Sequence, residues 1–354
     1  MIRPIYIHSS GSISIQPTFE QGYRFESVLP YTQNPVPAHE PDYKTFIPAL
    51  QLRRMNKSMR MAIFASRLAL RDAGRTAVDA VITGSGLGCL KDSERFVEAL
   101  LAEEGQSLNP TPFIQSTHNM AAAAIALSLG CKGYNMTYVN NANSFESALL
   151  DGMVYLSEHP KDTILLGGVD ELGERTTQFW DIAGYLKREA PEIPTSFEDI
   201  AIPGEIAAEG ATFFVASQHN NEEQAYGKVA AVETCLETDD ILAFVGRFLQ
   251  KNGLGAHAID AVFMGYNGDS RYDGIYRNLG QSLFPATLQM GFKHLLGEYD
   301  TIVAAALAMA LQLLKTQHIP LALRLNGVEP KGLARILIYT QRRGKNHSLV
   351  LVER

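Results

Sequence analysis

The chain has 354 residues and a formal net charge of −7; 46% of its residues are hydrophobic and 19% are charged. This composition excludes a disordered chain, and the acidic balance argues against nucleic-acid binding, which requires a positive surface. The three cysteines are too widely spaced for a disulfide framework or a zinc site, which fits a reducing compartment. With no signal-like start and no apolar run of about 20 residues, we expect a soluble, cytoplasmic protein without a membrane span.

The first half of the chain predicts alternating strands and helices. Residues 1–50, rich in proline and tyrosine, predict short strands and loops that lie over the body. From residue 52 to Ala73, apolar residues recur every three or four positions, which predicts a helix that stops at Gly74. The elements predicted next are strands at 79–84, 136–140, 163–169 and 211–216 and helices at 92–102, 119–129 and 144–157. Prolines break the chain at 109–112 and predict an irregular segment at 173–204.

The second half repeats this alternation. The polar residues 217–224 indicate a boundary between two halves, 1–217 and 218–354. The predicted elements that follow are strands at 228–232, 260–265, 321–325, 335–340 and 348–352 and helices at 239–252 and 301–315. The segment DAVFMG at 260–265 is similar to DAVITG at 79–84, which indicates a duplicated half. The whole pattern predicts an α/β fold.

The most informative stretch is a sharp strand-to-helix turn within residues 136–152. Asn143 falls at this turn, where it faces the first N–H groups of the next helix and its positive dipole end. A thiol at such a position would have a lowered pKa and act as a good nucleophile, whereas a neutral amide does not. Asn143 can cap the helix or form a hydrogen bond with a ligand, and the local pattern alone favours the cap.

Other candidate sites favour structural roles. The GSGLG turn at 84–88 lacks the spacing of a phosphate-binding loop, so we interpret it as a tight turn. Cys89 follows this turn, and we expect its thiol to be buried in the core. Ser144 lies in the first helical turn without the GxSxG context of a serine nucleophile. Asp170 and Glu171 have no accompanying ligand cluster, so they predict a hydrogen-bonded turn rather than a metal pair.

Several motifs in order carry a family resemblance. They are LRRMNKSMRMAIFASRLALRDAG, GSGLGCLKDSERF, PTPFIQSTHNMAAAAIA, TYVNNANSFESALLDG and LLGGVDE. This succession resembles the β-ketoacyl-[acyl carrier protein] synthases of the thiolase fold, and more closely a short branch found beside aryl-polyene and related pigment pathways. The resemblance covers residues 50–354. It implies a five-layered αβαβα fold of two similar halves, and it implies no metal or nucleotide cofactor.

The resemblance also places the catalytic positions of that family on this chain. The family uses an elbow cysteine that carries the acyl chain as a thioester, and two histidines that assist decarboxylation of the malonyl unit. Asn143 falls on the cysteine and Asn267 on the first histidine, while His294 matches the second histidine. Gln289 falls on a family lysine. The closing glycine-rich gate is reduced to residues 342–346, where Asn346 is retained.

The missing nucleophile determines the expected function. Because no thioester can form on an asparagine, we expect that this chain alone does not condense acyl units. The resemblance implies a chain-length-factor-like subunit that pairs with an active synthase, as a heterodimer or alternatively in a homodimer, during polyene or fatty acyl assembly on an acyl carrier protein. Two alternatives stay open: malonyl-carrier decarboxylation by Asn143 and His294, and an acyl hydrolase or transferase activity in the same pocket.

Family dimers also imply contact surfaces. They place the interface on the strand beside the elbow, at 137–139, and on the segment 115–119. The pocket or interface candidates are Gln115, His118, Asn119, Phe145 and Asn346. A basic set on the first long helix is a weaker candidate for docking the acidic carrier protein, since a solvated helix face is the default. Its members are Arg53, Arg54, Lys57 and Arg60.

Overall fold

The computed structural model describes residues 2–102, 108–188, 202–219 and 225–354, and its strands form one ten-stranded sheet. The strand order is β3-β2-β4-β5-β1-β6-β10-β9-β7-β8. The strands of the first half are β1 (Ile5–Ile13), β2 (Ala80–Gly84), β3 (Asn135–Tyr138), β4 (Thr163–Asp170) and β5 (Gly210–Ser217). Those of the second half are β6 (Gly227–Cys235), β7 (Ala261–Met264), β8 (Leu288–Gly291), β9 (Arg335–Arg342) and β10 (Lys345–Glu353).

The order is the same when it is followed from either edge to the middle. Strands β3-β2-β4-β5-β1 correspond to β8-β7-β9-β10-β6. In each half the first two pairings are parallel and the next two are antiparallel. The DAVITG and DAVFMG segments form β2 and β7, which hold equivalent places, so the predicted duplication is confirmed. The exact boundary after residue 217 stays a prediction, since residues 220–224 lie outside the described residues.

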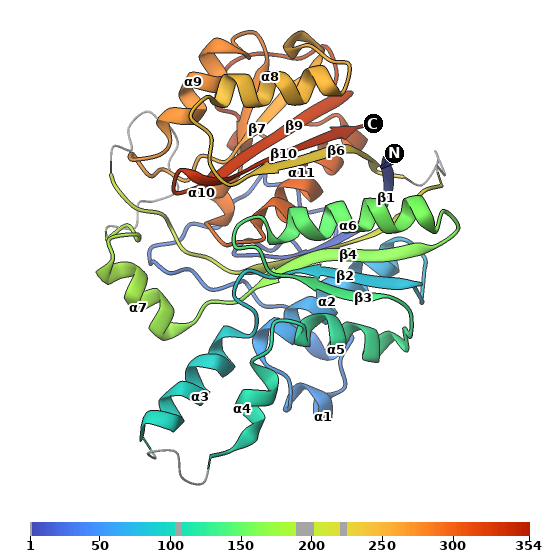
Figure 1. The fold of residues 1–354 in the computed structure, drawn as a ribbon, viewed down its shortest axis with the longest axis vertical. Helices are drawn as coiled ribbons and strands as arrows, with labels where there is room; N and C mark the ends of the chain where they lie inside the picture. Colours follow the sequence, from blue (N-terminus) through green and yellow to red (C-terminus); the bar gives the residue numbers. More distant parts are fainter. Residues whose placement is uncertain (1, 103–107, 189–201, 220–224) are drawn as a thin grey trace.

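Helices separate and cover the two halves of the sheet (Figure 1). The helices that form these layers are α2 (Lys57–Asp72), α5 (Met120–Leu129), α6 (Ser144–Glu158), α8 (Ile241–Lys251), α9 (Gly274–Ser282) and α11 (Ile302–Thr316). Helices α2 and α5 cover the outer face of the first half, and α8 and α9 cover that of the second. Helices α6 and α11 lie between the halves. This arrangement is the expected five-layered αβαβα fold.

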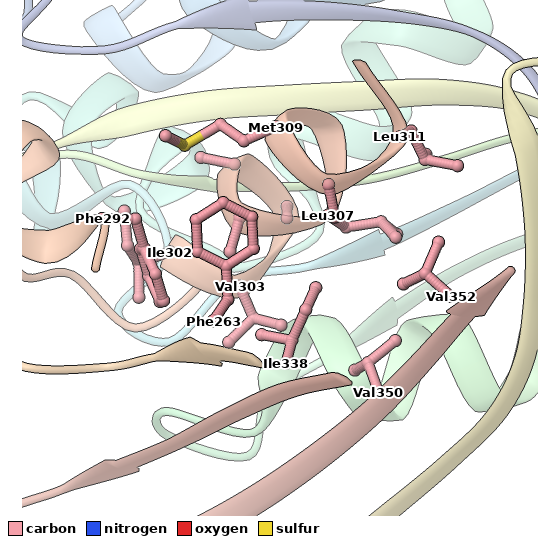
Figure 2. Packing of buried hydrophobic residues seen from close by; sticks show 14 of the residues in the cluster. Phe263, Phe292, Ile302, Val303, Leu307, Met309, Leu311, Ile338, Val350 and Val352 are labelled. Atoms are coloured by element: carbon pink, nitrogen blue, oxygen red, sulfur yellow. The ribbon is translucent and has the colours of Figure 1, made fainter. Parts of the chain in front are cut away.

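The layering explains why the central strands are continuously apolar. Along β2, Ile82 packs into the core around α11 whereas Val81 packs against α2 and α5. A strand that is buried on both faces needs apolar residues at every position. Figure 2 shows the central core, where Leu307 and Val303 of α11 lie against Val350 and Ile338 of the sheet. Burying each such side chain contributes roughly 1.5–3 kcal/mol.

The N-terminal segment confirms the predicted strand but not its place. Residues 5–13 form β1, which does not lie over the body but pairs with both β5 and β6 and thereby joins the two halves. Its buried face includes Ser9 and Gly11, where the backbone of α2 comes so close that a Cβ on Gly11 would lie 2.2 Å from the carbonyl oxygen of Ala65. The apolar alternation typical of a strand is interrupted there because only small residues fit.

Three other predictions are corrected. The proline break at 109–112 instead begins the short helix α4 (Pro110–Gln115), because proline is accepted at the first position of a helix. The segment predicted to be irregular contains α7 (Glu174–Ile182), and its residues 189–201 lie outside the described part. The strand predicted at 321–325 is a turn of 3-10 helix, η3 (Leu321–Leu323). Among the helices of the described residues, none has the length and apolar character needed to cross a bilayer.

Candidate functional site

Asn143 lies at the N-cap position of α6, but its side chain does not cap the helix. Its backbone dihedrals are φ −104° and ψ 16°, which is not the extended conformation that directs a capping side chain. The turn is closed instead by backbone bonds, from Asn143 N to the Asn140 carbonyl and from Ser144 N to the Asn141 carbonyl. Asn143 is 4% exposed, and its Oδ1 is buried without a hydrogen-bond partner among the described residues. The predicted side-chain cap is therefore wrong.

Ser144 holds the turn together and is not poised for attack. Its hydroxyl donates to the Asn141 carbonyl at 2.6 Å and accepts from Asn140 N at 2.9 Å. Both bonds are local to the turn, and Asn141 has a positive φ of 47°. The neighbouring Phe145 is fully buried in the central core, with its ring 6.0 Å from that of Phe214. The side chains of Ser144 and Phe145 therefore have structural roles next to Asn143.

Glu146, one helical turn after Asn143, is a buried carboxyl that the sequence analysis did not single out. It is 1% exposed, and neither carboxyl oxygen meets hydrogen-bond geometry with a described residue. Burial raises its pKa to about 7, and the opposing effects of Ser348 and Lys293 are smaller. Glu146 thus lies buried on α6 near Ser348 and Lys293 of the second half, with a pKa that burial raises toward neutrality.

A buried ion pair lies beside Asn267, the residue that the resemblance places on the first family histidine. Asn267 Nδ2 donates to Glu298 Oε2 at 2.9 Å, and Lys293 Nζ lies 2.8 Å from the same oxygen. Both members of the ion pair are 1% exposed. Lys293 Nζ also donates to the Gln341 carbonyl at 3.3 Å. The side chains next to Asn267 therefore form a buried ion pair.

His294, the retained family residue, is directed elsewhere. It lies on the short helix α10 (Lys293–Leu296), and its Nε2 is 2.8 Å from the carbonyl oxygen of Ala322, so Nε2 carries the proton and donates. Burial lowers its pKa to about 4, which keeps the ring neutral. The structure brings Asn267 together with Lys293, while the imidazole of His294 faces η3.

Buried carboxyls also lie where the two halves meet, at Asp170 and Glu171. Asp170, at the end of β4, accepts from Gly86 N with one oxygen and from both the backbone and the hydroxyl of Thr301 with the other. Burial and the nearby charge of Asp300 raise the pKa of Asp170 to about 7. This supports the predicted turn-closing role of Asp170. Glu171, buried beside it, accepts from the backbone N–H groups of Ser58 and Lys91.

Of the remaining pocket and interface candidates, Gln115, His118 and Asn119 lie in the first half and Asn346 lies in the second. Gln115 Nε2 donates to the Arg54 carbonyl at 2.8 Å, and the ring of His118 packs over Gly88. Asn119 precedes α5 without a side-chain cap bond. Asn346, in the β9–β10 turn, has a positive φ of 52° and donates its N–H to the Leu236 carbonyl. Their roles in a pocket or interface stay predictions.

The basic set does not form one exposed patch. Arg53 and Arg54 are exposed, whereas Arg60 is half-buried with its guanidinium 5.7 Å from the Tyr43 ring. Lys57 is 8% exposed and forms ion pairs with Glu209 and Glu40. Lys57 is thus unavailable for docking a carrier protein, which corrects the prediction for that residue.

Sequence reasoning missed a set of buried charged residues, of which Lys293 and Glu298 lie beside Asn267. The sequence did contain a signal for them, namely charged residues within otherwise apolar segments. A charged side chain is costly to bury unless it is paired, so such residues predict buried ion pairs. They are Glu146, Lys293, Glu298, Asp300, Arg342 and Glu205.

Among the described residues, no group of three or more His, Cys, Asp or Glu side chains could hold a metal ion.

Comparison with known proteins identifies the family. The model of the beta-ketoacyl synthase N-terminal domain matches residues 37–221, which is more than half of the chain. The chain belongs to the beta-ketoacyl synthase family. No curated protein matches it in sequence.

Solved structures support the same fold at low sequence identity. A beta-ketoacyl synthase from Burkholderia phymatum STM815 superposes with a TM-score of 0.82 at 15% identity, covering 99% of both chains. The ishigamide ketosynthase/chain length factor gives a TM-score of 0.80 at 18% identity over 100% of this chain and 99% of that chain. A ketosynthase in complex with its chain length factor from Xenorhabdus doucetiae gives 0.75 at 15% identity over 99% and 98%.

Proposed function

We propose that this chain is a non-condensing, chain-length-factor-like subunit that pairs with an active beta-ketoacyl synthase. The observation that carries the proposal is the buried amide of Asn143, which the resemblance places on the family's nucleophilic cysteine. Asn267, where the resemblance places the family's first histidine, is a second departure, because an amide can donate a hydrogen bond but does not titrate. Two of the similar structures are named as containing a chain length factor, which fits this role.

The edge of the sheet supplies a surface for the partner. Within the part of the chain that the structure describes, strand β3 pairs with β2 on one side only, so its other side offers backbone groups to a strand of a second subunit. Exposed apolar side chains accompany it: Met136 is 39% and Val139 51% exposed. Leu127, Phe113 and Ile114 on α5 and α4 are also exposed. Apolar residues gathered at a free sheet edge favour a large, stable interface.

Co-expression with an active synthase tests the proposal. We expect the purified chain alone to form no carbon–carbon bond from an acyl group and malonyl-carrier protein, to co-purify with the synthase, and to alter the length of its products. Carbon–carbon bond formation by the chain alone would overturn the proposal. So would synthase products of unchanged length, together with no complex on size-exclusion chromatography.

The same assay addresses the decarboxylase alternative. That activity would need His294 to lie near Asn143 and donate a hydrogen bond to the substrate. The N–H group at Nε2 of His294 instead donates its hydrogen bond to the Ala322 carbonyl. We therefore expect no release of CO₂ from malonyl-carrier protein by the chain alone. Release that is lost in His294→Ala but kept in a matched surface variant, His257→Ala, would favour the decarboxylase.

A further inference from the structure

Asp151 places a carboxyl group beside the edge of the sheet that β3 forms. It belongs to α6, which packs on the inner face of β2, β3 and β4. The hydroxyls of Tyr134, just before β3, and Tyr138, at its end, adjoin this carboxyl group from the same face. Asp151 is half-buried, and its Oδ2 is buried without a hydrogen-bond partner among the described residues. Burial outweighs the effect of the two hydroxyls and raises the pKa of Asp151, so the group is already partly dehydrated.

Stacked aromatic rings fix the surroundings of Asp151. The ring of Tyr134 stacks on that of Tyr155 with centroids 5.2 Å apart, and the ring of Tyr155 stacks on that of His159 at 4.4 Å. The Tyr155 hydroxyl donates to Asp162 Oδ2 at 2.8 Å. Because these contacts hold the Tyr134 ring in one orientation, the chain cannot easily rearrange here to give Asp151 another donor.

Apolar side chains also lie on this edge, next to Asp151. Leu150, the preceding residue of α6, is 40% exposed, and Met136 lies on the inner face of β3 between the two tyrosines. A subunit that covers these apolar side chains also removes water from Asp151. A carboxylate that loses its water is costly to bury unless the partner supplies a positive charge or a hydrogen-bond donor.

A second copy of this chain has no positive charge on the elements that would lie there. Antiparallel pairing of β3 with its own copy implies a two-fold axis perpendicular to the sheet, so both copies of α6 would lie on the same face of the joined sheet. Neither β3 nor α6 contains a lysine or an arginine. A homodimer of this kind would therefore bury two carboxyl groups, one from each α6, with no positive charge from either element.

We propose that Asp151 determines which subunit pairs with this chain, because it disfavours a homodimer and selects a partner that presents a positively charged side chain to its carboxyl group. This proposal rests on the proposed pairing with a synthase through the β3 edge, and it names a residue that distinguishes the heterodimer from the homodimer. Specificity of this kind comes from the penalty on the wrong partner as well as from the attraction of the right one.

Self-association of the purified chain tests the penalty on the homodimer. Asp151→Asn keeps the size of the side chain but removes its charge. We expect sedimentation velocity to give a self-association constant at least about tenfold higher for this variant than for the natural chain, because a neutral amide costs less to bury than a carboxylate. Asp151→Ser should change self-association in the same direction. Asp239→Asn removes the same charge from an exposed position of the second half and should have no effect.

Binding to the synthase used in co-expression tests the selection of the partner. We expect Asp151→Asn to bind this synthase at least about tenfold more weakly, so that its two affinities change in opposite directions, which general damage to the edge would not produce. The proposal is overturned if neither variant self-associates more strongly, or if binding to the synthase is unchanged. If the natural chain binds no synthase, the proposed function fails, whereas stronger self-association of Asp151→Asn would still support the role of Asp151 against the homodimer.

Discussion

At the scale of single residues, the protein buries carboxyls where water would normally stabilise their charge. Glu146 and Asp170 each have a pKa raised to about 7 by burial. Such a group binds more protons in the folded chain than in the unfolded chain, so its contribution to stability is complete below the unfolded pKa and is lost as pH rises through the folded value. The folded chain should therefore be more stable near pH 6 than near pH 8.

The substitution Glu146→Gln isolates the effect of this ionisation on stability, because the glutamine amide has nearly the same shape as the carboxyl group but cannot ionise. We expect the variant to be more stable than the natural chain at pH 8, by up to about 3 kcal/mol from the shift of the pKa, and nearly equal to it at pH 5. Thermal unfolding at several pH values measures the difference. Exposed Glu158→Gln serves as the matched change on the same helix. A gain of equal size at pH 5 and pH 8 would contradict the linkage.

The Lys293–Glu298 pair makes a complementary prediction. Either Lys293→Met or Glu298→Leu alone leaves one buried charge unpaired and should cost about 3 kcal/mol of unfolding free energy. The double variant removes both charges and should cost clearly less than the sum of the two single changes. Chemical denaturation gives the three values. Lys251→Ala, which breaks an exposed pair with Glu233, should stay within about 0.5 kcal/mol; additive effects at Lys293 and Glu298 would argue against the coupling.

At the scale of elements, the free edge of β3 has the properties of an interface. Its exposed apolar residues can be tested by one substitution, Val139→Arg, which places a charge that a partner subunit would have to bury. We expect this variant to keep its fold but to lose at least about tenfold in affinity for the synthase partner. Sedimentation or size-exclusion chromatography of the mixture measures the complex. Leu321→Arg, at an exposed apolar residue of the second half, should bind normally.

Helices and strands could be predicted from the sequence where burial makes their residues apolar. Helix α11 and strand β4 have unbroken apolar runs because they lie in the interior, and both were predicted to within a residue or two. Helix α7 was missed because it lies on the surface with only Thr177 buried, so it has no apolar period. The elbow position of Asn143 was also predictable, since a strand, a short turn and a helix follow one another in sequence.

The charged surroundings of the site were not predictable in the same way. Lys293 and Glu298 are close in sequence, but Asn267 and Gln341 come from other segments and meet them only in the folded chain. The direction of the His294 ring likewise depends on η3, which lies 28 positions further along the chain. Sequence spacing locates a residue on an element, but it does not determine which neighbour from a distant segment takes its hydrogen bond.

At the scale of the whole molecule, the two halves share one sheet and one central core, so they should unfold together. Trp180 is the only tryptophan and lies in the first half, which makes its fluorescence a reporter for that half. We expect the midpoint of its denaturation curve to coincide with that of far-UV circular dichroism, which reports both halves. A tryptophan transition that precedes the circular dichroism transition would show that the first half unfolds by itself.

Strand β1 has a practical consequence for anyone who prepares this protein. Among the strands of the described residues, it alone pairs with both β5 and β6, and it spans residues 5–13. Trimming those residues would uncover two sheet edges at once, and uncovered edges recruit other chains into aggregates. An affinity tag is therefore better fused after Arg354 than joined by a short linker ahead of Ile5, and a truncation beginning at Pro17 should accumulate in inclusion bodies.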